Sequence, residues 1–325
     1  AYHYITGKWD FTMGVRGELA DRTIFYREFT TPFNDPFLQA KNNPFNIIPS
    51  LNIKRILTDN ANLRLAASVT TTRPRIREIL PILYANGDFT TVAGNETLEN
   101  SVNYNLDIKY EYFIAGGGVF AFTAFGKYID KPIETVLEPI AGGRSLGFRN
   151  SKEATVAGVE AEYAMGLDKI FGAAGEWKNL RFGFNGSLMY TNTKIAEDNM
   201  FLTSNERKLQ GASPWLINSD LSYSKTFNAR WESVFTLAYN VYGPRIFALG
   251  ANNLNDAVEK PFHQLDLIWR NEIGKKVAFG ISVKNILNDT FRVTQVPSAS
   301  ALPEADIYAF KKGIDFSFSI GYTFD

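Results

Sequence analysis

Residues Gly313–Phe324 read Gly-Ile-Asp-Phe-Ser-Phe-Ser-Ile-Gly-Tyr-Thr-Phe. Successive side chains of an extended strand point to opposite faces, so the apolar residues of this stretch share one face. They are Ile314, Phe316, Phe318, Ile320, Tyr322 and Phe324. A strand of about 9–11 residues, apolar toward lipid and polar toward water, is what a membrane-spanning β-barrel requires. The last strand of a soluble β-sandwich also alternates, so repetition along the chain has to decide between the two folds.

The composition fits a membrane β-barrel and excludes several other classes. The 325 residues include 26 Phe and 15 Tyr but no Cys. Mean hydropathy is only −0.16, as expected for strands that face water on one side. No apolar run approaches the roughly 18 residues of a transmembrane helix. The lack of Cys removes disulfides, thiol catalysis and cysteine-ligated metals, and the zero net charge gives no basic footprint for nucleic acid.

The clearest two-faced strand spans residues 103–112. Its apolar face carries Tyr104, Leu106, Ile108, Tyr110 and Tyr112. Its other face carries Asn103, Asn105, Asp107, Lys109 and Glu111. Burying that second face in a dry sandwich core would desolvate charges at a cost on the order of several kcal/mol per group. A water-filled lumen removes this cost, so the pattern favours a barrel.

The same pattern recurs along the chain, with long and short connections in alternation. About twelve full strands and an initial fragment are expected. One connection, residues 166–179, is unusually long for the short-turn side. Pro49 is expected to mark a bulge. The predicted fold is therefore all-β, a transmembrane antiparallel β-barrel with periplasmic short turns and extracellular long loops. Because Ala1 lies inside a strand pattern, we expect the first part of the barrel to be missing from this sequence.

Aromatic residues near the strand ends predict two girdles, one at each membrane interface. Trp9, Trp231 and Trp269 fall at or near short-turn ends, and Trp177 lies within the long short-side connection. Trp215 falls at a long-loop end. The full predicted girdle is Trp9, Trp215, Trp231, Trp269, Tyr322 and Phe324.

Several blocks also resemble the TonB-dependent outer-membrane receptors of Bacteroidetes type. These blocks are Ile48–Asn52, Leu63–Leu65, Val69–Pro74, Arg77–Ile79, Gly94–Leu98, Asp130–Glu134, Ala154–Glu160, Leu209–Asn218 and Val283–Asn288. The resemblance covers nearly the whole chain from about Trp9. It implies a 22-stranded outer-membrane barrel plugged by an N-terminal domain, with a TonB box that couples the plug to the inner membrane. Counted back from Phe324, Trp9 would open strand 11, so residues 1–325 would be the C-terminal barrel portion, without the plug and the first strands.

The implied partners follow from that resemblance. They are outer-membrane lipid and lipopolysaccharide, the chain's own plug and barrel half, the TonB system, and a surface lipoprotein or other outer-membrane subunits. Neither a nucleic acid nor a cofactor is expected.

The candidate site residues fall into two sets. A basic-aromatic cluster at the extracellular mouth could contact an anionic or sugar-like ligand: Arg73, Arg75, Arg77, Tyr84 and Asn95. The alternative is that these arginines pair with lumen acids or lipopolysaccharide phosphates. A polar wall facing the lumen is predicted from Asp107, Lys109, Glu111, Glu160, Glu162, Asp220, Asp266, Arg270 and Lys284.

No enzyme constellation is evident, because His3 and His263 are the only histidines. Asp198, Asp256 and Glu259 could bind Ca²⁺ in extracellular loops, although solvated loop charge explains them as well, and no metal site is predicted. The leading hypothesis is a TonB-dependent barrel that imports a bulky nutrient or metal chelate. The alternatives are a receptor-derived barrel serving as a scaffold subunit of an outer-membrane complex, and a passive porin.

Overall fold

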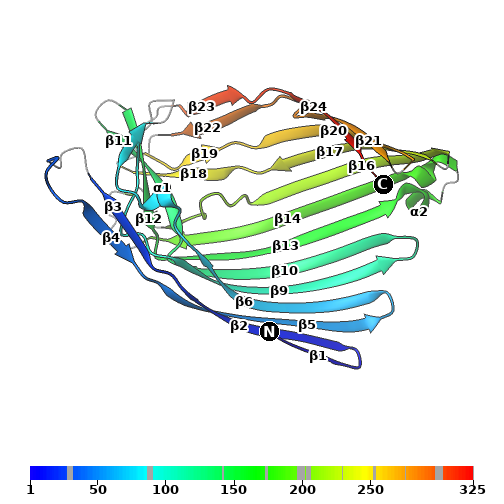
Figure 1. Cartoon of the computed structure of the whole chain (residues 1–325), viewed down its shortest axis with the longest axis horizontal. Helices are drawn as coiled ribbons and strands as arrows, with labels where there is room; N and C mark the ends of the chain where they lie inside the picture. Colours follow the sequence, from blue (N-terminus) through cyan, green and yellow to red (C-terminus); the bar gives the residue numbers. More distant parts are fainter. Residues whose placement is uncertain are drawn as a thin grey trace.

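The computed structural model describes residues 1–27, 32–85, 91–140, 143–172, 175–195, 202, 206–228, 230–251, 254–274, 276–296 and 303–324. Its main feature is one long, curved antiparallel sheet, called the wall here (Figure 1). In chain order the wall strands are β1 (Tyr2–Thr6), β2 (Trp9–Leu19), β5 (Phe45–Thr58), β6 (Ala61–Thr72), β9 (Ser101–Ile114), β10 (Gly118–Asp130), β13 (Glu153–Gly166), β14 (Leu180–Lys194), β16 (Trp215–Asn228), β17 (Trp231–Tyr242), β20 (Phe262–Ile273), β21 (Val277–Lys284) and β24 (Asp315–Tyr322).

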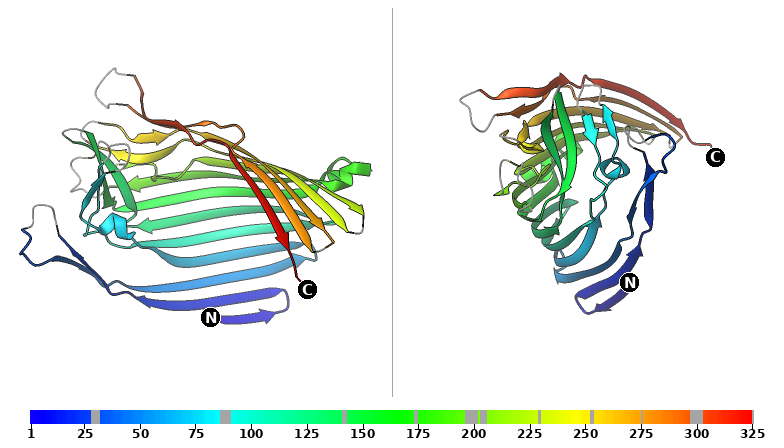
Figure 2. Two further views of the ribbon diagram at one scale, coloured as in Figure 1. Left: turned by 45° about the horizontal axis from the view of Figure 1, so that its top comes forward. Right: turned by 90° about the vertical axis from the view of Figure 1, so that its left-hand side faces the viewer.

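The order of these strands in the wall follows their order in the chain. The expectation of twelve strands and a fragment is confirmed, the fragment being β1. The wall curves into a trough whose two edge strands are β1 and β24 (Figure 2). Within the described residues, β1 pairs only with β2, and β24 pairs only with β21. The short strand β15 (Glu206–Arg207) pairs with β14, in the interior of the wall.

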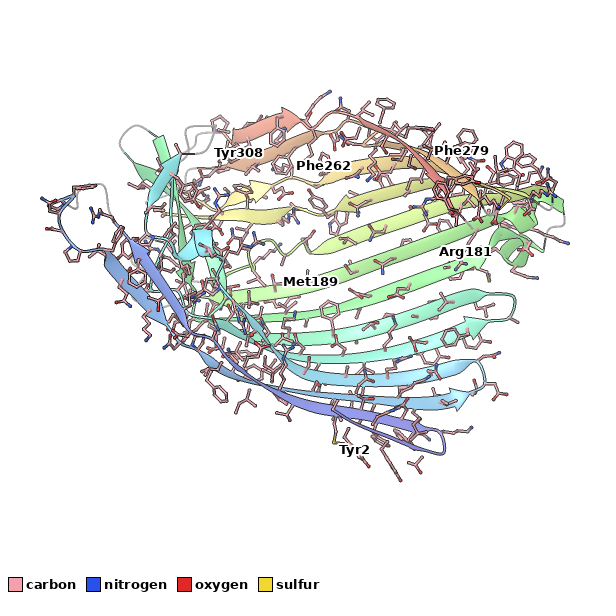
Figure 3. All side chains as sticks on the ribbon, in the orientation of Figure 1. Tyr2, Arg181, Met189, Phe262, Phe279 and Tyr308 are labelled. Atoms are coloured by element: carbon pink, nitrogen blue, oxygen red, sulfur yellow. The ribbon has the colours of Figure 1, made fainter. Side chains whose placement is uncertain are left out.

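Alternation within each strand gives the wall two chemically different faces, and side chains stand out on both (Figure 3). The register pairs Leu106 with Ala67 and Gly126, and Asp107 with Ala66 and Phe125. Cross-strand partners share a face. The apolar residues of successive strands therefore lie on one side of the wall, called the outer face, and the polar residues lie on the other, called the inner face. Tyr104 and Leu106 are each 50% exposed and Ile108 is 47% exposed, so this apolar face packs into no dry interior.

The long connections are not plain loops, as the sequence had suggested, but fold into a second sheet at the long-loop end, called the cap here. The cap contains β7 (Leu83–Ala85), β8 (Thr91–Ala93), β11 (Ile133–Ile140), β12 (Gly143–Asn150), β18 (Arg245–Gly250), β19 (Ala257–Glu259), β22 (Thr290–Gln295) and β23 (Ala305–Lys311). A separate hairpin pairs β3 (Arg22–Tyr26) with β4 (Leu38–Asn42).

Two parallel joins hold the cap together across the mouth. β11 pairs with β18 through Val136 and Leu249, and β12 pairs with β8 through Leu146 and Val92. Residues fully buried in the cap include Val136, Leu137, Ala248, Leu249 and Val293. A third buried cluster lies in the wall, where Ile129 of β10 packs with Ala154 and Val156 of β13. The hydrophobic core of the described residues is therefore divided between the cap and the adjoining ends of these two wall strands.

Helical structure is confined to short pieces: α1 (Ile76–Ile79), α2 (Leu167–Phe171) and the 3₁₀ turn η1 (Gly175–Asn179). None of the helices in the described residues is long and apolar enough to cross a membrane. The bulge expected at Pro49 is wrong. The register of β5 with β2 runs through Pro49 without a break, and the shift falls between Ile56 and Thr58 instead. Pairing of β5 with β6 begins only at Ser50. Pro49, which has no N–H to donate, therefore lies outside the hydrogen-bond ladder between these two strands.

Candidate functional site

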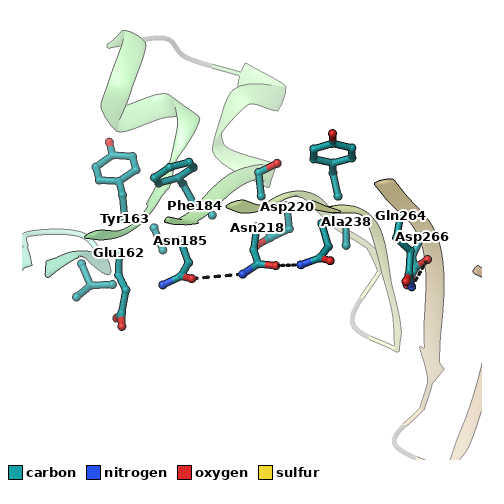
Figure 4. Close-up of a pocket in the computed structure, with 15 residues that line it drawn as sticks. Glu162, Tyr163, Phe184, Asn185, Asn218, Asp220, Ala238, Gln264 and Asp266 are labelled. Atoms are coloured by element: carbon teal, nitrogen blue, oxygen red, sulfur yellow. Dashed lines mark hydrogen bonds between the residues drawn. The ribbon is translucent and has the colours of Figure 1, made fainter. Parts of the chain in front are cut away.

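The inner face of the wall is the first candidate site, because the register gathers polar side chains there from many strands. One row across the wall contains Glu111, Ala121, Glu162, Asn185 and Asn218. By the same parity all nine residues predicted to face the lumen lie on this face: Asp107, Lys109, Glu111, Glu160, Glu162, Asp220, Asp266, Arg270 and Lys284. Figure 4 shows Glu162, Asn185 and Asn218 on one side of the sheet, and Tyr163 and Phe184 on the other.

Ion pairs link part of this polar wall. Arg64 Nε donates to Glu111 Oε2 at 2.7 Å, and Lys109 Nζ lies 3.3 Å from Glu162 Oε1. Within the described residues no ion pair is formed by Asp107, Glu160, Asp220, Arg270 or Lys284. The wall therefore keeps unpaired charges of both signs for groups that lie against it.

A ladder of amides continues the row toward the C-terminal strands. Asn218 Nδ2 donates to Asn185 Oδ1 at 3.3 Å, and Asn240 Nδ2 donates in turn to Asn218 Oδ1. Gln264 donates to Asp266 at 3.0–3.1 Å. These residues border a cavity of about 400 Å³ with Glu162 and Asp220. The arrangement offers hydrogen-bond donors and acceptors to a polar surface.

The predicted mouth cluster is only partly assembled. Arg77 stacks over the Tyr84 ring, 4.7 Å from its centroid. Arg73 instead pairs with Glu18 at the end of β2, the alternative in which an arginine meets a lumen acid. The Asn95 side chain donates a 3.0 Å hydrogen bond to the Phe148 carbonyl of β12, in the backbone of the cap. Arg75, at the start of α1, stays exposed.

The sequence did not reveal a buried polar cluster in the cap. Glu134, only 1% exposed, accepts hydrogen bonds from Ser151 Oγ and from the backbone N–H of Gln210. Burial raises the pKa of this carboxyl, against the opposing effects of Ser151 and Gln210. The Gln210 side chain accepts from the Thr135 N–H at 2.5 Å and donates to the Phe247 carbonyl. Gln210 thereby ties β11 to β18 next to their parallel join.

The carboxylates considered for calcium are used in ion pairs of the cap. Arg207 Nη1 lies 2.6 Å from Asp256 Oδ1, and Arg245 makes two bonds of 2.8–2.9 Å to Glu259, which also accepts from Tyr242. Asp198 lies outside the described residues. No cluster of three or more metal-ligating His, Cys, Asp or Glu side chains occurs in the described part of the chain.

The predicted girdle lies on the outer face. Trp9 stacks on Phe11 and is covered by Arg55, whose guanidinium is 4.9 Å from the ring. Trp231 Nε1 donates to Asn271 at 3.1 Å, and Trp269 Nε1 to Ser233 at 2.9 Å. Register parity gives Trp215 and Tyr322 the same face. Phe324, 84% exposed, follows β24 and contacts Tyr322 with ring centroids 4.8 Å apart.

A wall of antiparallel strands with an apolar outer face and a polar inner face defines an outer-membrane β-barrel. The family model described as "Outer membrane protein beta-barrel family" matches residues 1–319. The chain belongs to this family and is a multi-pass β-barrel protein of the outer membrane. No curated protein matches the chain in sequence.

Solved structures share the fold at low sequence identity. A mutant of the ferric enterobactin receptor PfeA from Pseudomonas aeruginosa matches with a TM-score of 0.57 and 17% identity, over 98% of this chain and 43% of that one. The copper transporter OprC gives 0.63 and 14%, over 98% and 46%. The ferric yersiniabactin uptake receptor FyuA from Yersinia pestis gives 0.59 and 14%, over 99% and 44%. The chain thus spans less than half the length of these receptors.

Proposed function

We propose that residues 1–325 are the C-terminal barrel portion of a TonB-dependent receptor of Bacteroidetes type that imports a bulky nutrient or metal chelate. The observation that carries this proposal is the open wall of thirteen described strands. Nearly all of it superposes on less than half of each receptor named above. A plug, a TonB box and the first barrel strands would belong to the polypeptide ahead of this portion.

The two free edges of the wall support the need for further strands. In hydrocarbon, each unpaired backbone N–H or C=O costs several kcal/mol, so membrane-spanning sheets close on themselves. The outward residues Phe316, Phe318 and Ile320 of β24 are 66–76% exposed, as lipid-facing residues are. β1 and β24 therefore require partner strands, and a barrel of about 22 strands, unlike a porin of about 16–18, is wide enough to hold a plug.

The inner face and the cap have separate roles in this proposal. The unpaired charges and amides of the inner face would hold the plug, and the cap would carry ligand recognition at the mouth. Arg77 and Tyr84 offer a cation and an aromatic ring for an anionic or sugar-like ligand. The cap could also meet a surface lipoprotein or other outer-membrane subunits.

Growth on a limiting nutrient tests the proposal in cells that carry the full-length gene. Deleting the gene, deleting its TonB box and removing the TonB system should each abolish uptake of the same nutrient. Stoichiometric co-purification with other subunits, with no uptake defect in any of the three strains, would favour the scaffold. Uptake that persists without the TonB system, with the leader cleaved immediately before Ala1, would favour the passive porin.

A further inference from the structure

The connection between β13 and β14 stands apart from the other short-side connections of the wall. The β9–β10 and β20–β21 connections run from Ile114 to Gly118 and from Ile273 to Val277. At the same end of the wall, Leu167–Phe171 instead form α2 and Gly175–Asn179 form η1 (Figure 1). We call this helical connection the foot. Because a short turn would join the two strands as well, the foot calls for a separate explanation.

The foot leans toward the outer face. Glu176 in η1 accepts a 2.6 Å hydrogen bond from Tyr223 and a 3.1 Å bond from Lys225. Tyr223 pairs with Leu180 and Phe235 in the register and shares their outward parity. In Figure 4 the helical connection rises on the same side as Tyr163 and Phe184, opposite Asn185. The foot therefore lies over the rim of the lipid-facing surface and not across the lumen.

The foot displays apolar side chains that stay exposed in the described chain. Ile170 is 37% exposed, Phe171 68% and Trp177 45%. The rings of Phe171 and Trp177 meet edge to face, with centroids 5.9 Å apart. Neither α2 nor η1 contains a buried residue. Phe171 and Trp177 therefore form an exposed aromatic pair, with Ile170 next to Phe171 in the chain.

The charges of the foot are largely neutralised by local partners. Lys169 lies 3.5 Å from Asp168, and Lys225 neutralises Glu176. Lys178 is the one foot cation without an ion pair within the described residues. Paired charges beside exposed aromatic rings suit a membrane interface, where Trp and Phe enter the headgroup layer and a Lys reaches water.

We propose that the foot is an interfacial anchor that inserts Ile170, Phe171 and Trp177 into the phospholipid headgroup layer on the periplasmic side of the outer membrane. Continuity selects lipid over a protein partner, because the foot joins the lipid-facing outer face. It also lies at the same end of the wall as the girdle residues Trp9 and Trp231. The anchor is independent of transport and would be present in a receptor, a scaffold or a porin.

Site-directed spin labelling of the full-length protein in nanodiscs of phosphatidylcholine with phosphatidylglycerol tests the anchor. This chain has no Cys, so labels at Phe171→Cys and Trp177→Cys report one site each once any cysteines elsewhere are replaced. Asp59→Cys, in the exposed β5–β6 turn at the same end, is the matched control. Both foot labels should collide more often with oxygen than with a water-soluble nickel chelate, and the Asp59 label should show the reverse.

Two results would overturn the anchor. The first is that the label at Phe171→Cys in nanodiscs is accessible to the nickel chelate, although the labelled protein migrates as a folded barrel on unheated gels. The second is a label that is water-exposed in nanodiscs and becomes protected only in isolated outer membranes, which would assign the foot to a protein partner. As a measurement that needs no label, Lys178→Gln should leave tryptophan quenching by brominated lipid unchanged, whereas Trp177→Ser should lower it.

Discussion

Gln210 follows Glu134 by 76 residues, yet its backbone N–H donates a 3.2 Å hydrogen bond to the Glu134 carboxylate. The same residue bonds to Thr135 and Phe247 through its side chain. One glutamine therefore fastens β11 and β18, which come from different long connections of the wall. The long connections that form the cap are therefore linked by hydrogen bonds and are not independent loops.

Replacing Gln210 with Ala should loosen the cap without disturbing the wall. The change leaves the Thr135 N–H and the Phe247 carbonyl without partners, which costs about 1–3 kcal/mol for buried groups. Hydrogen exchange should accelerate in residues 133–137 and 245–250, while β9 and β10 exchange as before. Gln264→Ala is the control, since the side-chain bonds of Gln264 within the described residues stay in the wall, to Asp266. Equal acceleration in both variants would contradict the role of Gln210.

The cap should open more readily as pH rises. Burial raises the pKa of Glu134 above its ordinary 4.5, so above pH 4.5 the opened state has released a proton that the closed state retains. Closing stability then falls as pH rises from 4.5 through the raised pKa. Hydrogen exchange of β11, corrected for intrinsic rates, should show this loss in the parent protein. It should be absent in Glu134→Gln, and the same slope in that variant would assign it to another group.

At the mouth, Arg77 and Arg73 should behave differently. Arg77 stacks on Tyr84, whereas Arg73 is held by Glu18. If the mouth cluster receives the ligand, Arg77→Ala should weaken binding about tenfold, which corresponds to about 1.4 kcal/mol. Arg73→Ala should change it much less. Titration of purified receptor with the transported ligand measures both, and unchanged affinity in Arg77→Ala would remove Arg77 from the binding site.

Adjacent residues of β9 should tolerate a new cation very differently. Leu106→Lys places a charge on the lipid-facing side and should destabilise the barrel by about 2–4 kcal/mol near the bilayer midplane. Asp107→Lys places the same group on the inner face, where the aspartate has no ion pair in the described residues. Folding into vesicles along a urea gradient compares the two. Similar losses in both variants would mean that the faces are not distinguished.

The wall could be predicted from sequence because its signal is local. Every second residue from Asn103 to Tyr112 reports its face directly, and Trp9 or Trp231 marks a strand end without knowledge of the neighbours. The cap could not be predicted in this way. Its parallel join pairs Val136 with Leu249, which are far apart in the sequence. No turn residue and no hydrophobic periodicity predicts that pairing. Glu134 and Gln210 lie in blocks that resemble the receptors in sequence, but their contact depends on that join. Spacing alone groups Arg73 with Arg75 and Arg77, whereas its partner Glu18 lies 55 residues away in the sequence.

The central claim is that each wall strand shows one flank to lipid and the other to water. Single cysteines from residue 104 to residue 109 in the full-length protein, reconstituted in vesicles, test it most directly. Spin labels attached at positions 104, 106 and 108 before reconstitution should collide more often with oxygen than with a water-soluble nickel chelate, and labels at positions 105, 107 and 109 should show the reverse. Labels at positions 104, 106 and 108 that are protected from both, as in a dry soluble core, would contradict the barrel.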